Sequence, residues 1–378
     1  MTEGGPSGPP SFFVGRVLHT STVNRDLQTR RALVEWFRRG HRDMPWRRTR
    51  EPYAVWVSEI MLQQTRVETV TPYFERWMRR FPTVATLAEA PLDDVLRHWA
   101  GLGYYARARN MHAAARDVVT GYEGKFPPTA EGLRALKGVG AYTAGAIASI
   151  AYGEAAAIVD GNVVRVLARV DALPGAADEA ELKRRVWERA GELVRADGGE
   201  AAGDFNQAMM ELGAMVCTPR APGCSKCPLA KLCRARAEDS IAAHPGAKTK
   251  KAPRAVDAVA VLAERDGKLL LVRRPPTGLW GGLWEPPMRE IAAGETPEAA
   301  AQRVAKSCTG LTLSNIQSID RFDHVLTHRR MRFHVFRARA RGRLKLDGYD
   351  AARWQARTGS DEVGVAAWTK RLFSKELT

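Results

Sequence analysis

The sequence predicts two domains of different class, an all-α domain followed by an α+β domain. A chain of 378 residues is too long for one ordinary core and suits two domains of common size. Over residues 25–236, apolar residues recur at three- and four-residue spacing, which is typical of amphipathic helices. Over residues 255–378, short β-rich runs alternate with turn residues, which indicates strands.

The segments outside these two domains lack periodicity. Residues 1–24 begin MTEGGPSGPP, which has no apolar run of a secretory signal, so we expect a disordered tail. Residues 237–254 gain Pro and charge, as an interdomain linker does. In the second domain we expect a strand pair around Asp266-Gly267, another around Gly342, and one helix in ETPEAAAQRVAKSCTGL.

The charge balance favours a nucleic-acid partner. The chain has 58 Lys plus Arg against 42 Asp plus Glu, a formal net charge of +16, and such an excess attracts a polyanion. A membrane surface would attract the same charge, but no apolar run is long enough to span a bilayer. We therefore expect that the protein binds no membrane. Because the amino-terminal segment lacks a secretory signal, we expect the protein to stay in the cytoplasm, associated with the nucleoid if its source is bacterial, and we expect a monomer.

Four of the five cysteines fall in one short stretch, CTPRAPGCSKCPLAKLC. Their spacing is C-x6-C-x2-C-x5-C, and the intervening Pro, Gly and Lys residues predict a tight loop that turns four thiolates toward one centre; the cysteines are Cys217, Cys224, Cys227 and Cys233. A metal site in a reducing compartment fits this clustering better than a disulfide framework. The spacing alone leaves a structural zinc and an iron-sulfur cluster open. The cations Arg220, Lys226 and Lys231 in this loop are placed to meet phosphates.

A glycine turn separates a short helix from a longer one in LKGVGAYTAGAIASIAYG. Gly138, Val139 and Gly140 form this turn, and its backbone amides, with the amino terminus of the following helix, can bind a DNA phosphate. An ordinary turn between two helices is the alternative, and this motif alone does not decide.

Two carboxylates stand in different surroundings. Asp160 directly precedes an apolar-periodic helix, where it is either a plain N-cap or an anion kept ionised by the helix dipole to face a developing cation. Glu59 is flanked by Val57 and Ile60, so it is either a surface residue of an amphipathic helix or, in an apolar cleft, a proton donor with a raised pKa. Cleavage of a glycosidic bond needs one acid and one anion.

Four segments together resemble the MutY family of adenine DNA glycosylases: VWVSEIMLQQTRVETV, GLGYYARARN, GVGAYTAGAIASIAYG and VDGNVVRVLARV. The resemblance implies a helix-hairpin-helix domain with a 4Fe-4S cluster held by the cysteine loop. It implies base excision repair of double-stranded DNA, with removal of adenine opposite 8-oxoguanine or guanine. The target base cannot react inside a stacked duplex, so it has to be flipped out.

The resemblance also assigns roles to residues. Glu59 would protonate a ring nitrogen of adenine, Asp160 would stabilise the oxocarbenium ion, and Tyr142 and Asn162 would support Asp160 and the sugar. The residues that match the family's adenine pocket are Arg42, Trp46, Arg47 and Gln207. Those that match its DNA wedge are Gln64, Leu102 and Tyr104.

The position of Tyr142 predicts a monofunctional enzyme. Bifunctional endonuclease III relatives carry a Lys there, whose amine forms a Schiff base with the sugar, and a phenol cannot form that imine. Some T:G glycosylases share the Tyr, so a T:G or oxidised-pyrimidine glycosylase is a competing hypothesis, against which Glu59 and the second domain argue. A non-catalytic damage sensor, the third hypothesis, would lack one of the two carboxylates.

The second domain resembles a Nudix fold in GGLWEPPMREIAAGETPEAAAQRVAKSCTGL. Active Nudix hydrolases hold magnesium with a glutamate cluster, but this chain has Val304, Ser307 and Cys308 at those positions, so we expect no such metal site. The resemblance implies that this domain recognises the lesion through FDHVLTHRRMRF, with Thr327 and His328. Thr327 stands where many members have serine, and an ordinary strand turn is the alternative.

Overall fold

The computed structural model describes residues 14–248, 252–326, 328–356 and 363–376. The chain forms two compact units. We expected one boundary at the linker, but each unit is made of two separate segments of the chain. The first unit contains the chain up to Ile60 and from Lys125 to Thr249, and the second contains Met61–Gly124 and the chain from Lys250 onward. The helical region is therefore shared between the units. None of the described helices is long and apolar enough to cross a membrane.

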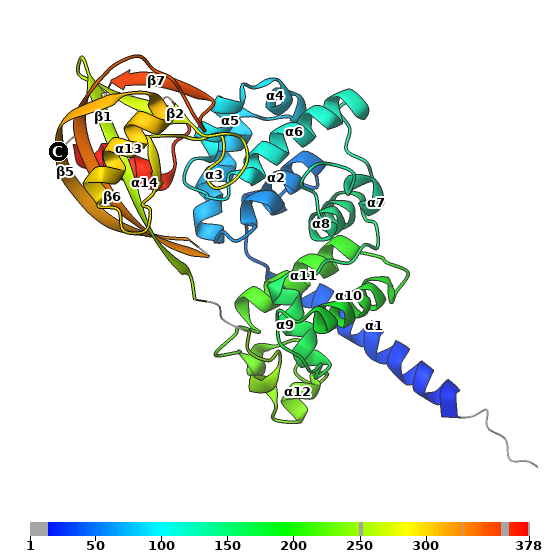
Figure 1. The fold of residues 1–378 in the computed structure, drawn as a ribbon. Coiled ribbons are helices and arrows are strands. Elements are labelled where there is room, and N and C mark those ends of the chain that lie inside the picture. Colours follow the sequence, from blue (N-terminus) through cyan, green and yellow to red (C-terminus); the bar gives the residue numbers. More distant parts are fainter. Residues whose placement is uncertain (1–13, 249–251, 327, 357–362, 377–378) are drawn as a thin grey trace, which may run out of the picture. The chain divides into compact units, whose positions relative to one another are not determined.

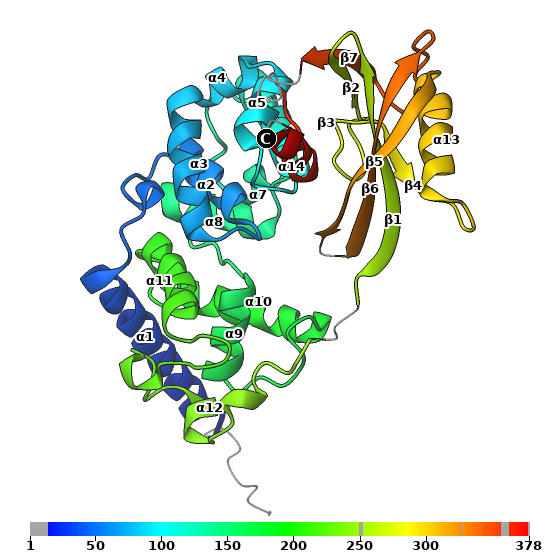
Figure 2. The same cartoon turned by 90° about the vertical axis from the view of Figure 1, so that its left-hand side faces the viewer.

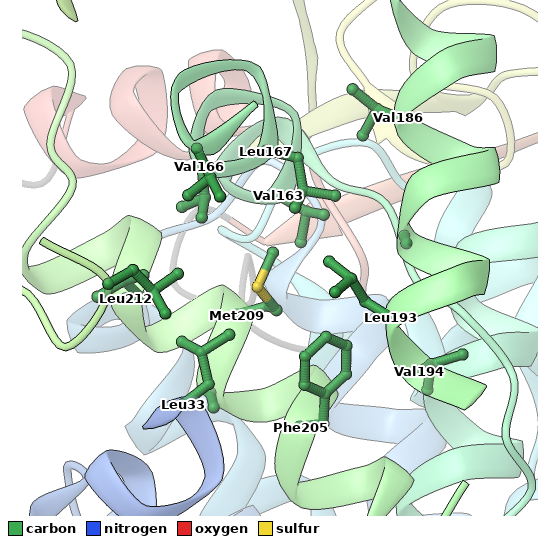
Figure 3. Packing of buried hydrophobic residues seen from close by; sticks show 14 of the residues in the cluster. Leu33, Val163, Val166, Leu167, Val186, Leu193, Val194, Phe205, Met209 and Leu212 are labelled. Carbon is green, nitrogen blue, oxygen red and sulfur yellow. The ribbon is translucent and has the colours of Figure 1, made fainter. Parts of the chain in front are cut away.

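The first unit is helical. Its elements are α1 (Val14–Gly40), η1 (Pro45–Arg47), α2 (Pro52–Leu62, which runs on into the second unit), α7 (Ala130–Leu133), α8 (Ala141–Tyr152), α9 (Gly161–Val170), α10 (Ala180–Arg195), α11 (Ala202–Met215), η2 (Cys224–Lys226), α12 (Arg234–Ala237) and η3 (Ile241–Ala243). Helices α1, α9, α10 and α11 pack against one another (Figure 1). Figure 3 shows their apolar side chains meeting in one core, among them Leu33, Leu167, Leu193, Phe205 and Met209. Burial of each such side chain stabilises the fold by roughly 1.5–3 kcal/mol.

Within the second unit, the segment Met61–Gly124 forms the helices α3 (Val67–Arg80), α4 (Val84–Glu89), α5 (Leu92–Trp99) and α6 (Ala106–Gly121). Aromatic residues fix the packing of α3 on α5, since the rings of Trp77 and Trp99 meet edge to face with centroids 5.5 Å apart. Helix α4 begins at a capping box in which Thr83 and Thr86 satisfy each other's backbone amides.

The second unit also contains a seven-stranded sheet with the order β3-β2-β1-β6-β5, while β4 pairs with β1 and β7 pairs with β2. The strands are β1 (Arg254–Arg265), β2 (Lys268–Arg273), β3 (Trp284–Glu285), β4 (Met288–Glu290), β5 (Thr312–Val325), β6 (Arg329–Arg341) and β7 (Ala351–Ala356). Strands β1 and β6 are parallel, and the other pairs are antiparallel. Figure 2 shows α13 (Pro297–Thr309) and α14 (Ala367–Glu376) on opposite faces of this sheet.

The structure agrees with part of the expected topology of this sheet and corrects part of it. The turn at Asp266 and Gly267 joins β1 to β2 as expected, with φ values of +51° and +72° that suit Asp and Gly. The strand pair expected around Gly342 is wrong, because β6 ends at Arg341 and pairs with β5 and β1 while residues 343–350 form no strand. Helix α14 was not expected, because the sequence pattern indicated only α13.

The ends of the predicted domains also shift. Helix α1 begins at Val14, inside the segment 1–24 that the sequence suggested is disordered. Within the expected linker, residues 237–254, the chain forms the short helix η3 before β1 starts at Arg254. The segment that its glycine and proline content predicted to be irregular therefore extends past the residue at which α1 begins.

Candidate active site

Glu59 lies near the end of α2, and its side chain is buried, with 5% of the residue exposed. The hydroxyl of Tyr142 donates a hydrogen bond to Glu59 Oε2 over 2.7 Å. Burial raises the pKa of Glu59 to about 7, because desolvation outweighs the opposing hydrogen bond from Tyr142 and the charge of Arg47, while Asp160 adds to the rise. Of the two alternatives, surface residue or cleft residue, the structure favours the second.

Asp160 is the N-cap of α9 and uses both carboxylate oxygens. Oδ1 accepts the backbone N–H of Val163 over 2.8 Å, and Oδ2 accepts the side-chain amide of Asn162 over 2.9 Å. Burial nevertheless raises the pKa of Asp160 above its ordinary value, while these two residues and the charge of Arg165 oppose the rise. The helix amino terminus hydrogen-bonds the carboxylate, but burial outweighs this support, so the pKa of Asp160 is raised and not held low by the helix dipole.

Tyr142 lies in the first turn of α8 and faces Glu59. Its hydroxyl oxygen also lies 3.0 Å from Met210 Sδ, on α11. Burial raises the pKa of Tyr142 well above its ordinary value, with the nearby carboxyls of Glu59 and Asp160 adding to the rise, so the phenol keeps its proton. Support of Asp160 was the expected role of Tyr142, whereas its hydroxyl makes hydrogen bonds to Glu59 and Met210.

The glycine turn before α8 is open on its outer side. Gly138 adopts a φ of +79°, which L side chains rarely adopt, and Gly140 is the N-cap of α8 with no side chain to occupy the first amides. A Cβ at Gly140 would have no atom within 4 Å, so another backbone or a phosphate can approach it closely. The side chain of Val139 is buried and anchors the turn.

Glu211 links two of the residues expected in the adenine pocket. Arg42 Nη2 donates to Glu211 Oε2 over 2.7 Å, and Arg47 Nη2 donates to the same oxygen over 2.9 Å. Burial alone would raise the pKa of Glu211, but the hydrogen bonds from Arg42 and Arg47 hold it at about 2. Trp46 is buried beside them in the chain, and Gln207, one turn before Glu211 on α11, is half-buried.

Glu211 was not among the residues expected from the sequence, although a signal was present. In FNQAMMELG, Gln207 and Glu211 are four residues apart and therefore share one face of a helix. Met210 was missed as well, because a methionine in an apolar helix is ordinarily a core residue.

Arg165 connects Asp160 to the cysteine loop. Its guanidinium donates to Asn162 Oδ1 over 2.9 Å and to the backbone oxygen of Cys217 over 2.7 Å. Asn162 in turn donates to Asp160, so three side chains form one continuous network. These contacts hold the Asn162 side chain against Asp160, the residue that we expected it to support.

The structure brings the four cysteines of the loop to one pocket of the first unit, which Arg169 also lines; the cysteines are Cys217, Cys224, Cys227 and Cys233. Arg169 fixes the start of the loop by donating to the backbone oxygens of Thr218, over 2.8 Å, and Pro219, over 3.0 Å. No group of three or more His, Cys, Asp or Glu residues in the described part of the chain is placed to hold a metal ion. Arg220, Lys226 and Lys231 are exposed on the loop.

The residues expected to form the DNA wedge lie in the second unit. Gln64 and Tyr104 both have positive φ, +57° and +48°, and Tyr104 is 48% exposed. The guanidinium of Arg107 donates to the backbone oxygens of Gln63 and Gly103. It therefore links the loop of Gln64 to the loop of Tyr104, which we call the wedge loops. No role of its own was expected for Arg107 from the sequence. Leu102 differs from expectation, because its side chain is buried, with 5% exposed.

The sheet domain has no glutamates at the positions that hold magnesium in a Nudix hydrolase. Val304 and Cys308 are buried on α13, where they pack into the apolar core of the domain, and Ser307 is exposed. His328 is exposed beside the start of β6, and its backbone oxygen accepts the N–H of Arg254 over 3.0 Å. Thr327 lies outside the described residues.

Both domains are similar to known families. Residues 57–192 match the HhH-GPD superfamily of base excision DNA repair proteins, and residues 258–375 match the NUDIX domain. The adenine DNA glycosylase of Homo sapiens is 36% identical over 401 residues, covering 91% of this chain and 73% of the human protein. That of Schizosaccharomyces pombe is 32% identical, covering 85% of this chain and 84% of the yeast protein. A thermostable thymine-DNA glycosylase structure is 28% identical, with a TM-score of 0.51, and covers 58% of this chain and 99% of that chain.

Proposed function

Because this chain belongs to the adenine DNA glycosylase family, we propose that it hydrolyses the N-glycosidic bond of adenine mispaired with 8-oxoguanine or guanine in double-stranded DNA. The observation that carries this proposal is the pair of buried carboxyls, Glu59 with its raised pKa and Asp160 at the N-cap of α9. Two carboxyls held in different surroundings are what an acid and an anion require.

Glu59 acts as the general acid. With a pKa of about 7, a large fraction of Glu59 carries a proton near neutral pH, and that proton passes to a ring nitrogen of the adenine. Protonation weakens the bond to the sugar, and the anion of Asp160 stabilises the positive charge that develops there. The departing adenine takes the electron pair of the broken bond. Water then adds to the sugar, and the proton that it loses passes to the carboxylate of Glu59.

Arg42, Arg47 and Glu211 form a rigid charged edge that selects the base. Glu211 is held ionised by the two arginines, and its oxygens accept hydrogen bonds from Arg42 and Arg47. It therefore fixes the guanidinium groups, which would donate hydrogen bonds to the ring nitrogens of the base. Trp46 and Gln207 complete the proposed pocket with an aromatic surface and an amide.

We propose that the wedge loops replace the flipped base in the stack. Tyr104 is half exposed and can stack beside the lesion, and Gln64 lies on the loop that Arg107 holds next to it. Leu102 is buried in this structure, so its part in the wedge would require it to leave the protein core. The turn of Gly138, Val139 and Gly140 would bind a backbone phosphate through its amides.

The four cysteines of the loop would hold a 4Fe-4S cluster. All four thiols line one pocket, and four cysteine thiolates are the usual ligand set of such a cluster. The same donors would also suit zinc, so the resemblance of the loop to that of the endonuclease III superfamily is what favours the cluster. When bound, the cluster supplies a rigid anchor for the loop. Arg220, Lys226 and Lys231 on that loop would then meet phosphates.

Two finer properties complete the proposal. Tyr142 stands where a Schiff-base lysine would be needed, and its pKa is raised well above its ordinary value, so we propose a monofunctional enzyme without strong lyase activity. The sheet domain would recognise the lesion through His328, together with Thr327. The likeness to a thymine-DNA glycosylase makes thymine opposite guanine the alternative substrate.

Single-turnover base release separates these substrates. Duplexes carrying A opposite 8-oxoguanine, A opposite G, and T opposite G are each incubated and then read with and without alkali. We expect alkali-dependent cleavage of the adenine strand, fastest opposite 8-oxoguanine and lost in Glu59→Gln, while Glu188→Gln on the exposed side of α10 retains full activity. Release of thymine, or strand cleavage without alkali, would contradict the proposal.

A further inference from the structure

The hydroxyl of Tyr142 has two acceptors and one proton. Its oxygen lies 2.7 Å from Glu59 Oε2 and 3.0 Å from Met210 Sδ. A phenol can donate only one hydrogen bond, although its oxygen can also accept. Burial keeps the phenol protonated, so its proton is directed to one partner or the other and is not lost to solvent.

The protonation state of Glu59 decides between these two arrangements. When Glu59 is ionised, its carboxylate is the stronger acceptor, and Tyr142 donates to it. When Glu59 carries a proton on Oε2, its O–H can donate to the oxygen of Tyr142 across the same 2.7 Å, which leaves the proton of Tyr142 free to turn to Met210 Sδ, 3.0 Å away. Each arrangement satisfies every proton, and no charge moves between the three residues.

The other groups that act on Glu59 carry charge, whereas Met210 is neutral. Arg47 on η1 lowers the pKa of Glu59, and Asp160 before α9 raises it. The charge of Arg47 is itself engaged by Glu211 on α11. Met210, also on α11, is the neutral acceptor on this side of the site.

We propose that Met210 is a positioning residue that stabilises the protonated form of Glu59, by accepting the Tyr142 proton whenever Glu59 donates to Tyr142. Without the sulfur, the phenol proton would have no acceptor in the acid form and would return to Glu59, which favours the carboxylate. After Glu59 gives up its proton, the hydroxyl turns back and stabilises the carboxylate that results. The catalytic consequence rests on the proposed function, but the proton arrangement does not.

The first test reads the proton of Glu59 directly in the full-length protein. Glutamate labelled with 13C at the side-chain carboxyl gives a titration curve for Glu59, assigned by its loss in Glu59→Gln. We expect Met210→Leu to lower the pKa of Glu59 by about half a pH unit, the size of one weak hydrogen bond. Met210→Gln, which restores an acceptor, should retain the wild-type value.

Two control variants separate this role from packing. Met209→Leu changes the adjacent residue of α11, whose side chain points into the core (Figure 3), and should leave the pKa unchanged. In a Tyr142→Phe background, Met210→Leu should cause no further shift, because the shared proton is absent. An unchanged pKa in Met210→Leu, or an equal shift in the Tyr142→Phe background, would overturn the proposal.

The second test connects the proton to the reaction. In Met210→Leu, the alkaline fall of the base-release rate should begin about half a pH unit lower than in the wild-type protein. At alkaline pH the rate should therefore be about threefold lower, and at acid pH it should be unchanged. If the wild-type protein releases no adenine while the carboxyl titration shifts as expected, the proposed function fails and the inference on Met210 stands. If adenine is released and the titration does not shift, the inference alone fails.

Discussion

Glu59 and Glu211 are both buried glutamates of the first unit, yet their pKa values differ widely, at about 7 and about 2. Desolvation raises both. Glu211 accepts hydrogen bonds from two guanidinium groups, whereas Glu59 accepts one from a neutral phenol. The comparison teaches that burial alone does not make an acid, and that the number of cations within hydrogen-bonding distance decides which glutamate keeps its proton.

Removal of the acid should have the largest effect. Glu59→Gln keeps the shape of the side chain but cannot donate the same proton, so we expect adenine release to fall by about 100- to 10,000-fold. Thermal unfolding should change little in comparison. Single-turnover kinetics with Glu188→Gln as the control measures the loss, and a decrease of less than tenfold would remove Glu59 from the acid role.

Glu211→Gln should affect stability more than any change at Glu59. It leaves Arg42 and Arg47 without their anion, and Arg47 is buried, so we expect a loss of about 3 kcal/mol in the free energy of unfolding. The folded-state pKa of Glu211 is lowered, so its stabilisation is present above about pH 4.5 and is lost as pH falls toward 2. The difference between wild type and variant in urea unfolding should shrink accordingly on acidification.

The pH dependence of the reaction should follow Glu59. The acid form of Glu59 is required, and its pKa is about 7, so the rate should fall about tenfold for each pH unit above 7. Below pH 7 the rate should stay level until Asp160, whose pKa is raised above its ordinary value, takes up a proton. Glu211 stays ionised throughout this range and should contribute no limb. A rate–pH profile measured by single turnover, in which the rate instead rises above pH 7, would contradict the acid role of Glu59.

The smallest effect should come from the more exposed arginine of the pair. The side chain of Arg42 is 31% exposed against 7% for Arg47, so solvent replaces part of what Arg42→Gln removes. We expect a loss of about 1 kcal/mol in thermal unfolding, since Arg47 still neutralises Glu211. If Arg42→Gln costs as much as Glu211→Gln, the two arginines do not share the charge as described.

Sequence patterns located local features well. The Gly138–Gly140 turn and the N-cap position of Asp160 are properties of neighbouring residues, and both are present in the structure. The four cysteines line one pocket, but within the described residues they do not form a group placed to hold a metal ion. The family resemblance also identified Glu59. The periodicity of its helix alone did not favour a buried position for this residue. Contacts between distant segments could not be predicted in this way. Glu211 is far in sequence from Arg42, and nothing in either segment indicates their pairing.

The same limit applies to the sheet. Gly342 looked like a hairpin turn because β-rich runs flank it, yet the partners of β6 are β5 and the distant β1. Helix α14 is short and ends the described chain, so its pattern was too weak to predict. Leu102 was assigned to the wedge by resemblance, and only its burial in the structure shows that the side chain points into the protein.

The parallel pairing of β1 with β6 also bears on how the chain folds. Its register joins Arg254 to Arg329 and Glu264 to Arg339, so each pair closes a long loop of intervening sequence. Such nonlocal pairs form slowly, because the entropy of loop closure is lost before any contact compensates for it. During synthesis, the apolar middle of β1 cannot pair with β6 until the ribosome has made β6, and in that interval its unpaired apolar edge favours aggregation.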